Sequence, residues 1–318
     1  MTDAARRSPW PIPARLNIAL AVIAWTAAAG FLWLGSHAQT WWHWLLACVG
    51  FALVNNTIFA LLHEAAHGTF HPNRRLNDTF GRVCAAFFPT GFIIQRACHL
   101  GHHRRNRTDA ELFDYCPSGT AMWLCGFRLF CLLGGFYWLS VPLACLLYVV
   151  GIVRTRLFRE KIAEFYGMRP MVEDICQASP RIVMTEILVT TAIQLALFLS
   201  LDLNWAGWLA CYWSFALVWC SVQYSTHAWT PRDIRNGAWN LSVSRLTRAL
   251  FLNYHYHLAH HQHPAAPWSA LHSLIDQTRP RPSWARIYWS LWLGPRRTSE
   301  PDPGAPTSDL EQELESAL

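Results

Sequence analysis

The stretch WWHWLLACVGFALVNNTIFALLHEAAH, residues 41–67, predicts a membrane-spanning helix that leads into a metal site. Its apolar run, from about Trp41 to Leu62, has the roughly 20 residues that a helix needs to cross a bilayer. The first histidine cluster, His63-Glu64-Ala65-Ala66-His67, follows at once, and His63 and His67 share one helical face because they are four residues apart. Imidazoles clustered beside lipid are costly unless they bind something, and imidazole is the commonest side-chain metal ligand.

Two further clusters repeat this chemistry beside other apolar runs. They are His99-Leu100-Gly101-His102-His103 and His257-Leu258-Ala259-His260-His261. Adjacent helical residues point about 100° apart, so each terminal histidine doublet can serve two different metals. The three clusters supply eight imidazoles, whereas a catalytic zinc ion uses about three protein ligands. We therefore expect two ions, and a nitrogen-rich set without thiolates suits iron, copper, zinc or nickel.

Residues just beyond the fourth apolar run extend this site. His227 is the natural ninth ligand. Gln223, which ends the run one turn earlier, is favoured as a helix-end polar residue, and the alternative is that it hydrogen-bonds a metal-bound water. Other histidines are expected near the site or at the interface rather than as ligands: His71, His255, His263 and His272. His37 and His43 lie on the opposite membrane face and are excluded.

The apolar runs predict two helical hairpins of the same orientation. The first joins about Leu16–Leu34 to Trp41–Leu62, and the second joins about Ile182–Leu201 to Trp205–Gln223. The linker within each hairpin lacks Lys and Arg, whereas Arg residues flank its outer ends. By the positive-inside rule, the outer ends and both chain termini face the cytoplasm.

Residues 121–153 do not fit a simple crossing. This segment is apolar but is interrupted by Gly134, Gly135 and Pro142. A single crossing would separate the first two histidine clusters from the third, so we expect a re-entrant or interfacial segment, with a weaker one over 79–94. We thus expect an all-α membrane domain over 16–295 with a cytoplasmic cap, a cytoplasmic segment 1–15, and a tail 296–318 too polar to fold alone.

Composition agrees with a membrane protein. Of 318 residues, 53% are hydrophobic and 14% are charged, against about 25% charged in soluble domains. The 18 Trp suit the membrane–water boundary. The net charge of +6 comes almost wholly from Arg beside apolar runs, which favours topology setting and no nucleic-acid partner. The ten Cys contain no C-x-x-C pair, and we expect buried small hydrophobes rather than disulfides or thiolate ligands.

HEAAH also matches H-E-x-x-H, the zinc metalloprotease signature. In that interpretation His63 and His67 bind zinc and Glu64 is the general base. It leaves the six histidines of the other clusters without a role, so the two-metal interpretation is favoured. A non-catalytic metal- or haem-handling membrane protein stays as a third possibility.

The boxes HEAAH, HLGHH and HLAHH, in this order beside four apolar runs, resemble those of the membrane fatty acid desaturase superfamily. The resemblance covers about Leu16 to Leu293 and implies a cytoplasmic di-iron centre that uses O2 as co-substrate. It implies as ligands the eight clustered histidines and the extra histidine after the last span: His63, His67, His99, His102, His103, His227, His257, His260 and His261. Many relatives have Glu in the third box, where this chain has Ala259.

The resemblance implies a fatty acid desaturase of lipid metabolism that introduces a double bond into an acyl chain carried by CoA, a carrier protein or a phospholipid. Hydroxylases, ketolases and decarboxylases share the scaffold and the ligand set. The sequence contains no haem H-P-G-G motif and no Cys cluster, so we expect a separate electron donor, such as ferredoxin or cytochrome b5 with its reductase. The expected location is multi-pass in a bacterial inner membrane.

Several polar residues are candidates to orient the imidazoles from behind. They are Glu64, Asp109, Glu111, Asp114, Gln223, Asn240 and Asn253. Arg104, Arg105 and Arg107 follow the second box, where they either attract an acidic donor or head group or simply orient the chain in the membrane.

Overall fold

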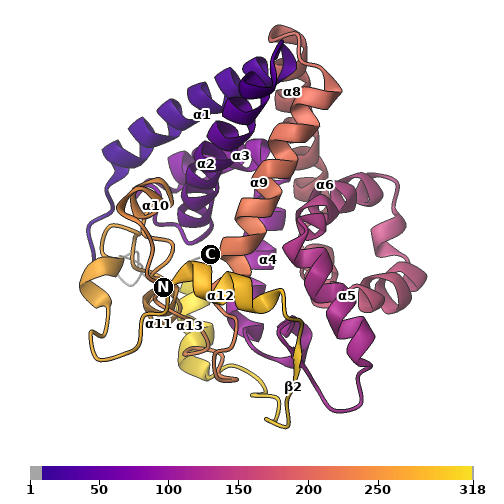
Figure 1. Ribbon diagram of the computed structural model, residues 1–318, viewed down its shortest axis with the longest axis vertical. Helices are drawn as coiled ribbons and strands as arrows, with labels where there is room; N and C mark the ends of the chain where they lie inside the picture. The colour runs from indigo at the N-terminus through magenta and orange to yellow at the C-terminus, as the bar shows by residue number, and fades with distance from the viewer. Residues whose placement is uncertain (1–8, 317–318) are drawn as a thin grey trace.

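Four long helices form two hairpins, as the apolar runs predict (Figure 1). The computed structural model describes residues 9–316, so residues 1–8 of the expected N-terminal segment and 317–318 of the tail lie outside it. Four described helices are long and apolar enough to cross a membrane. They are α1 (Ala14–Ser36), α2 (Trp41–Ala66), α8 (Pro180–Ser200) and α9 (Trp205–Ser225).

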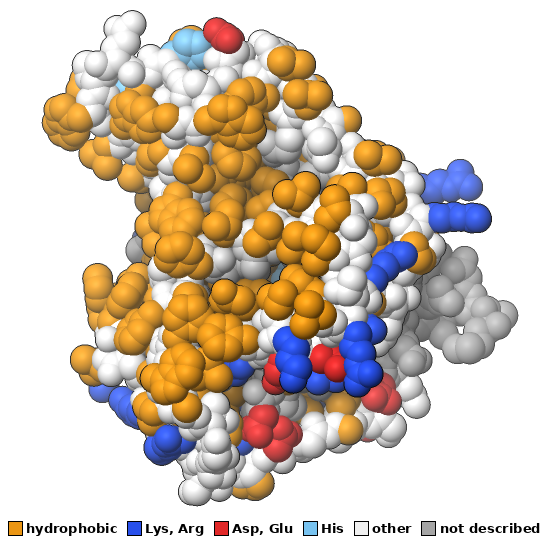
Figure 2. Space-filling view, turned by 90° about the vertical axis from the view of Figure 1, so that its right-hand side faces the viewer, with side chains coloured by type: hydrophobic (Ala, Val, Ile, Leu, Met, Phe, Trp, Pro, Cys, Tyr) orange, Lys and Arg blue, Asp and Glu red, His pale blue; other side chains and the backbone are white. Residues whose placement is uncertain are grey.

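Helix α2 lies at the centre of this bundle. It packs against both α1 and α9, and its second half, from Phe51 onward, is largely buried. The outward faces of the long helices stay apolar: Leu199 is 72% exposed and Ile23 is 66% exposed. Figure 2 shows hydrophobic side chains spread over one face, with charged side chains gathered toward its lower part. Such a surface is stable when lipid covers it.

Two bent helix pairs complete the apolar part of the fold. Helices α3 (Arg74–Phe87) and α4 (Phe92–Arg105) meet at 93°, and α5 (Met122–Leu133) and α6 (Phe136–Val149) meet at 85°. Each pair is a broken span or a re-entrant loop by length and composition. The break between α5 and α6 falls at the Gly134-Gly135 pair, where Gly135 adopts a φ of 84° that favours glycine. That α5–α6 does not cross the membrane stays a prediction.

Shorter elements complete the fold, and α11, α12, α13 and β2 lie at the polar end of the molecule, below the long helices in Figure 1. The helical ones are η2 (Asp109–Glu111), η3 (Ile152–Arg154), η4 (Phe158–Ala163), α7 (Arg169–Gln177), α10 (Arg245–Leu250), α11 (His257–Gln262), η5 (Leu271–Leu274), α12 (Trp284–Leu291) and α13 (Ser308–Ser316). Strands β1 (Tyr115–Cys116) and β2 (Arg296–Arg297) pair in parallel, with Tyr115 opposite Arg296.

A buried ion pair ties this polar end to the membrane helices. The Arg107 guanidinium donates to the Asp114 carboxylate at 2.8 and 3.1 Å, and both side chains are 0% exposed. Asp114 also accepts hydrogen bonds from the Tyr224 hydroxyl at the end of α9 and from the Trp229 backbone, each at 2.6 Å. Every donor faces the same carboxylate, so the loop after α4 is fixed against the end of α9.

The C-terminal segment is more ordered than its composition predicts. Residues 308–316 form α13, in which Leu310 is 2% exposed and Leu314 is 1% exposed. The two leucines are four residues apart, so one helical face buries both against Leu100 and Ile234. The expectation of disorder rested on average polarity and overlooked this amphipathic spacing.

The cysteines also depart from expectation at one place. A disulfide joins Cys116 in β1 to Cys125 in α5, although no C-x-x-C pair predicts it and disulfides are not expected from the sequence. The two residues come together because the loop between them turns back onto the start of α5. The eight free cysteines are buried or partly buried, as expected of small hydrophobes.

Candidate metal centre and substrate cavity

Nine histidines from four segments converge at the polar end of the long helices: the end of α2, α4, the residues after α9, and α11. Their ring nitrogens fall into two groups, and within each group the nitrogens lie within 4.8 Å of one another. The first group is His63, His67, His99, His103 and His260, and the second is His102, His227, His257 and His261. Each of the nine candidate ligands named from the sequence belongs to one of these two groups, and the other histidines lie outside both groups.

The histidine doublets are split between the groups, as helical geometry predicts. On α4, His103 belongs to the first group and His102 to the second. On α11, His260 belongs to the first group and His261 to the second. Adjacent residues on a helix point about 100° apart, so one short helix serves both groups at once. The fold therefore forms a paired site rather than one crowded site.

In the first group the Nε2 atoms face one another in a chain. His67 to His99 is 2.7 Å, and His99 to His103 is 3.2 Å. His103 to His260 is 2.9 Å, and His260 to His63 is 3.1 Å. A neutral imidazole carries a single N–H, so five converging nitrogens cannot all be satisfied by donating to one another.

The second group is built around His227, which follows the end of α9 by two residues. Its Nε2 lies 3.1 Å from Nε2 of His102. The rings of His257 and His261 pack edge-on against it, with centroids at 4.7 and 4.9 Å. Neither ring nitrogen of His261 has a hydrogen-bond partner among the described residues, although both are buried.

Burial keeps these rings in the form that binds a cation. Desolvation, followed by repulsion from neighbouring imidazoles, lowers the pKa of His227, His257, His260 and His261 well below the usual value. The rings are therefore neutral at pH 7 and present lone pairs. Converging buried lone pairs without a donor fit a metal ion in each group, and the absence of thiolate ligands fits a first-row metal bound by imidazole.

Two contacts hold the second group in place from behind. The Glu111 carboxylate lies 2.5 Å from Nδ1 of His102, and the Gly237 carbonyl accepts a hydrogen bond from Nδ1 of His227 at 2.9 Å. Both contacts fix the tautomer that leaves Nε2 free. Glu111 is in turn 3.3 Å from Arg105, which pairs with Asp174 of α7 at 2.6 Å.

Several expected orienting residues have other roles. Asp109 is exposed and pairs with Arg232 at 2.6 Å, so it is not the acidic partner of an imidazole. Asp114 belongs to the buried pair with Arg107. Asn253 contacts Arg248 and the Trp268 carbonyl instead of a histidine. Asp109, Glu111 and Asp114 are close together in the sequence. The η2 turn directs Glu111, and not the other two, toward His102.

Glu64 and Gln223 stay close to the histidines without binding them. Glu64 accepts hydrogen bonds from the Thr69 hydroxyl at 2.7 Å and from the Trp268 backbone at 3.1 Å, and it lies 3.9 Å from Nδ1 of His63. The Gln223 side-chain oxygen accepts a hydrogen bond from the Tyr254 hydroxyl. Asn240 instead supports α11, because its side-chain oxygen accepts from the Ala259 backbone at 3.1 Å.

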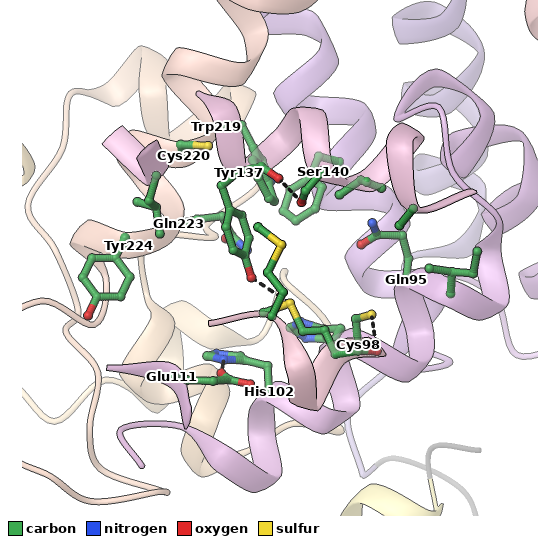
Figure 3. A pocket seen from close by; sticks show the side chains of 18 of the residues that line it. Gln95, Cys98, His102, Glu111, Tyr137, Ser140, Trp219, Cys220, Gln223 and Tyr224 are labelled. Carbon is green, nitrogen blue, oxygen red and sulfur yellow. Dashed lines mark hydrogen bonds and ion pairs between the residues drawn. The ribbon is translucent and has the colours of Figure 1, made fainter. Parts of the chain in front are cut away.

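An apolar cavity of about 180 Å³ opens beside the histidines. Helices α2, α4, α6, α7 and α9 all contribute to its walls (Figure 3). Imidazoles from both groups line it: His63, His99, His102 and His227. Most of the remaining lining is aliphatic or aromatic, including Phe59, Leu62 and Trp219. A lipid-soluble chain or ring held in this cavity would therefore contact the candidate metal-binding histidines directly.

A known protein is similar in sequence to part of this chain. Beta-carotene ketolase from Paracoccus sp. (strain PC1) is 34% identical over 110 residues, a match that covers 31% of this chain and 45% of the ketolase. The chain thus matches less than half the length of that relative. A family model for fatty acid desaturases matches residues 39–292, which include all nine clustered histidines. Because this match covers most of the chain, the protein belongs to the fatty acid desaturase family.

Proposed function

We propose that this protein is a membrane oxidoreductase that uses O2 and two iron ions to oxidise an unactivated C–H bond of a lipid-soluble substrate. Desaturation of an acyl chain is the leading reaction. The observation that carries the proposal is the meeting of both histidine groups at one wall of an apolar cavity. When bound, the iron pair would supply the redox chemistry that no side chain can perform alone.

The reaction balances with an external reductant. Desaturation removes two hydrogen atoms from neighbouring carbons, and O2 leaves as two molecules of water when the donor supplies two electrons and solvent supplies two protons. We propose a separate protein as the donor, such as ferredoxin or cytochrome b5 with its reductase.

The chain's own residues would hold the two ions, orient the imidazoles and keep water out of the site. The five imidazoles of the first group would hold one ion and the four of the second group the other. Glu111 and the Gly237 carbonyl orient His102 and His227. Phe59, Leu62 and Trp219 exclude water from the substrate side of the site.

Oxygen insertion is a second candidate. The similarity of part of this chain to a beta-carotene ketolase supports it, because a ketolase inserts oxygen into its substrate. Hydroxylases, ketolases and decarboxylases would use the same histidines, so the ligand geometry does not discriminate between them. Only the product distinguishes these reactions.

A zinc protease is much less favoured. His63 and His67 share their group with three further imidazoles, which leaves no three-ligand zinc site with an open position. One carboxylate oxygen of Glu64 accepts from both Thr69 and Trp268, which is typical of an acceptor that holds the structure together. One zinc ion with activity that survives without O2 would overturn the di-iron proposal.

We also propose that the histidine end faces the cytoplasm of a bacterium and that both chain termini lie on that side of the inner membrane. Arg residues flank the outer ends of both hairpins, and a soluble donor would reach the metals from there. Reporter fusions to the C-terminus and to the loop after Ser36 test this orientation. An accessible periplasmic C-terminus would contradict it.

Product analysis tests the reaction. Lipids and pigments of cells that express the chain are compared with those of a His102→Ala control, under 18O-labelled O2. A new double bond without label supports desaturation, and a new labelled hydroxyl or keto group supports oxygen insertion. A profile identical to the control across lipids and carotenoids would contradict both.

A further inference from the structure

Two polar side chains in the cavity wall have no oxygen or nitrogen partner in the described part of the chain. The Gln95 amide lines the cavity and makes no hydrogen bond to a described residue. The Tyr137 hydroxyl has as its hydrogen-bond partner the thioether sulfur of Met171, at 2.8 Å. Figure 3 shows both groups directed toward the middle of the cavity.

Such groups are costly in an apolar cavity. A buried tyrosine hydroxyl usually finds an oxygen or nitrogen partner, and thioether sulfur is a weak acceptor. The half-buried Gln95 amide faces the cavity without a protein partner, so it can bond only to water or to a ligand that enters the cavity. Their shared direction indicates a partner that arrives with the substrate.

The position of the two groups places that partner close to the clustered histidines that line the cavity. Gln95 lies four residues before His99 on α4, so it sits about one helical turn, roughly 5.4 Å, along the cavity wall from a clustered imidazole. Tyr137 projects from α6 on the opposite wall, and its hydroxyl points toward the side of the cavity where His102 lies (Figure 3). A polar group held between them is near the reacting carbon.

The charges around the cavity limit what this group can be. No Lys or Arg is among the described residues that line it. The carboxylate that does line it, Glu111, is engaged by His102 and Arg105. An ionised carboxylate or phosphate would therefore have no cation to pair with, whereas a hydroxyl or carbonyl needs only hydrogen bonds.

We propose that Gln95 and Tyr137 recognise a neutral oxygen function, a hydroxyl or carbonyl, on the substrate inside the cavity. This inference rests on the proposed function for the identity of the cavity as the substrate site. The substrate class is then an oxygen-bearing lipid whose polar group enters the protein, not a bare hydrocarbon or a free fatty acid entering carboxylate first.

Equilibrium binding to the purified protein, kept free of O2 and reductant so that no turnover occurs, tests the proposal. The probes are radiolabelled hexadecanol, hexadecane and palmitate, presented in detergent micelles. Wild type is expected to bind hexadecanol about ten-fold more tightly than hexadecane or palmitate, the value of one or two hydrogen bonds. Equal affinity for hexadecanol and hexadecane, tighter binding of palmitate, or no binding of any probe would overturn the proposal.

Variants assign the preference to the two residues. Gln95→Leu and Tyr137→Phe each lower the preference several-fold, and the double variant abolishes it while hexadecane affinity stays unchanged. Ser140→Ala is the matched control, because this lining hydroxyl already donates to the Tyr137 backbone carbonyl at 2.6 Å, and its removal leaves the preference intact. Met171→Leu also keeps the preference.

A purely structural role for Tyr137 would give a different pattern. Met171→Leu would then reproduce the effect of Tyr137→Phe, because both break the same internal contact, and this result would contradict recognition. Product analysis tests the proposed function separately. If the enzyme is active but shows no preference for hexadecanol, the recognition proposal is wrong and the proposed function stands. If the preference is present but no O2-dependent product forms, the proposed function is wrong and the recognition proposal stands.

Discussion

The Glu111 carboxylate lies 2.5 Å from Nδ1 of His102, and this contact fixes the imidazole so that its Nε2 faces His227. Glu111 is buried and also faces Arg105, which pairs with Asp174 on α7. The same histidine lines the cavity, so one carboxylate links the metal-binding end to the cavity wall. Burial raises the pKa of Glu111, but the His102 imidazole and then Arg105 outweigh it and hold that pKa below its usual value, which keeps the carboxylate ionised as an acceptor.

Replacing Glu111 with Ala is therefore expected to loosen His102 and to lower metal affinity or product formation by about 10- to 100-fold. Metal content of the purified variant, measured by mass spectrometry, checks this. Asp109→Ala is the matched control, because that carboxylate is 53% exposed and pairs with Arg232 away from the histidines. Equal losses in both variants would contradict a specific role for Glu111.

Asp114→Ala is expected to destabilise the protein strongly, by about 3–5 kcal/mol, because it leaves Arg107 buried without a partner. Thermal unfolding in detergent, followed by intrinsic tryptophan fluorescence, measures the loss. Glu160→Ala breaks the exposed pair with Arg156 and should cost about 0–1 kcal/mol. Similar melting temperatures for Asp114→Ala and wild type would show that the buried pair does not hold the polar end.

Gly135→Ala tests the break between α5 and α6. A φ of 84° costs a residue with a Cβ roughly 1–2 kcal/mol, and the added atom would lie 3.3 Å from the Ala216 Cβ. Gly30→Ala serves as control, since nothing lies within 4 Å of the new atom inside α1 and Ala is the better helix former. We expect Gly135→Ala to melt at a lower temperature than wild type and Gly30→Ala to melt at an equal or higher temperature. A wild-type melting temperature for Gly135→Ala with a lower one for Gly30→Ala would refute the role given to Gly135.

Limited proteolysis tests the packing of α13. The double variant Leu310→Ala, Leu314→Ala removes two buried side chains, each worth about 2–5 kcal/mol, and should release the helix from Leu100 and Ile234. Cleavage within residues 298–316 is then expected to become much faster. Leu293→Ala, which alters an exposed side chain, should leave the rate unchanged. Equally fast cleavage in wild type would mean that α13 is not held in place.

The sequence predicted the long helices and the nine clustered histidines because their signals are local. Apolar length defines α1, α2, α8 and α9, and the spacing of His102 and His103 predicts that they serve different groups. The partners of those histidines are not local. Glu111 and Asp109 are two residues apart with the same chemistry, and only the η2 turn distinguishes them. The α13 contact and the Cys116–Cys125 disulfide likewise depend on segments that meet only in three dimensions.

Metal stoichiometry in paired variants tests the central claim most directly. Wild type, purified with iron, is expected to hold about two iron ions per chain, since two imidazole groups of four to five members are present. His260→Ala and His261→Ala alter adjacent residues of α11 that belong to different groups, so each should lose about one ion while the other stays bound. A single ion in wild type, or the same single site lost in both variants, would contradict a two-metal centre.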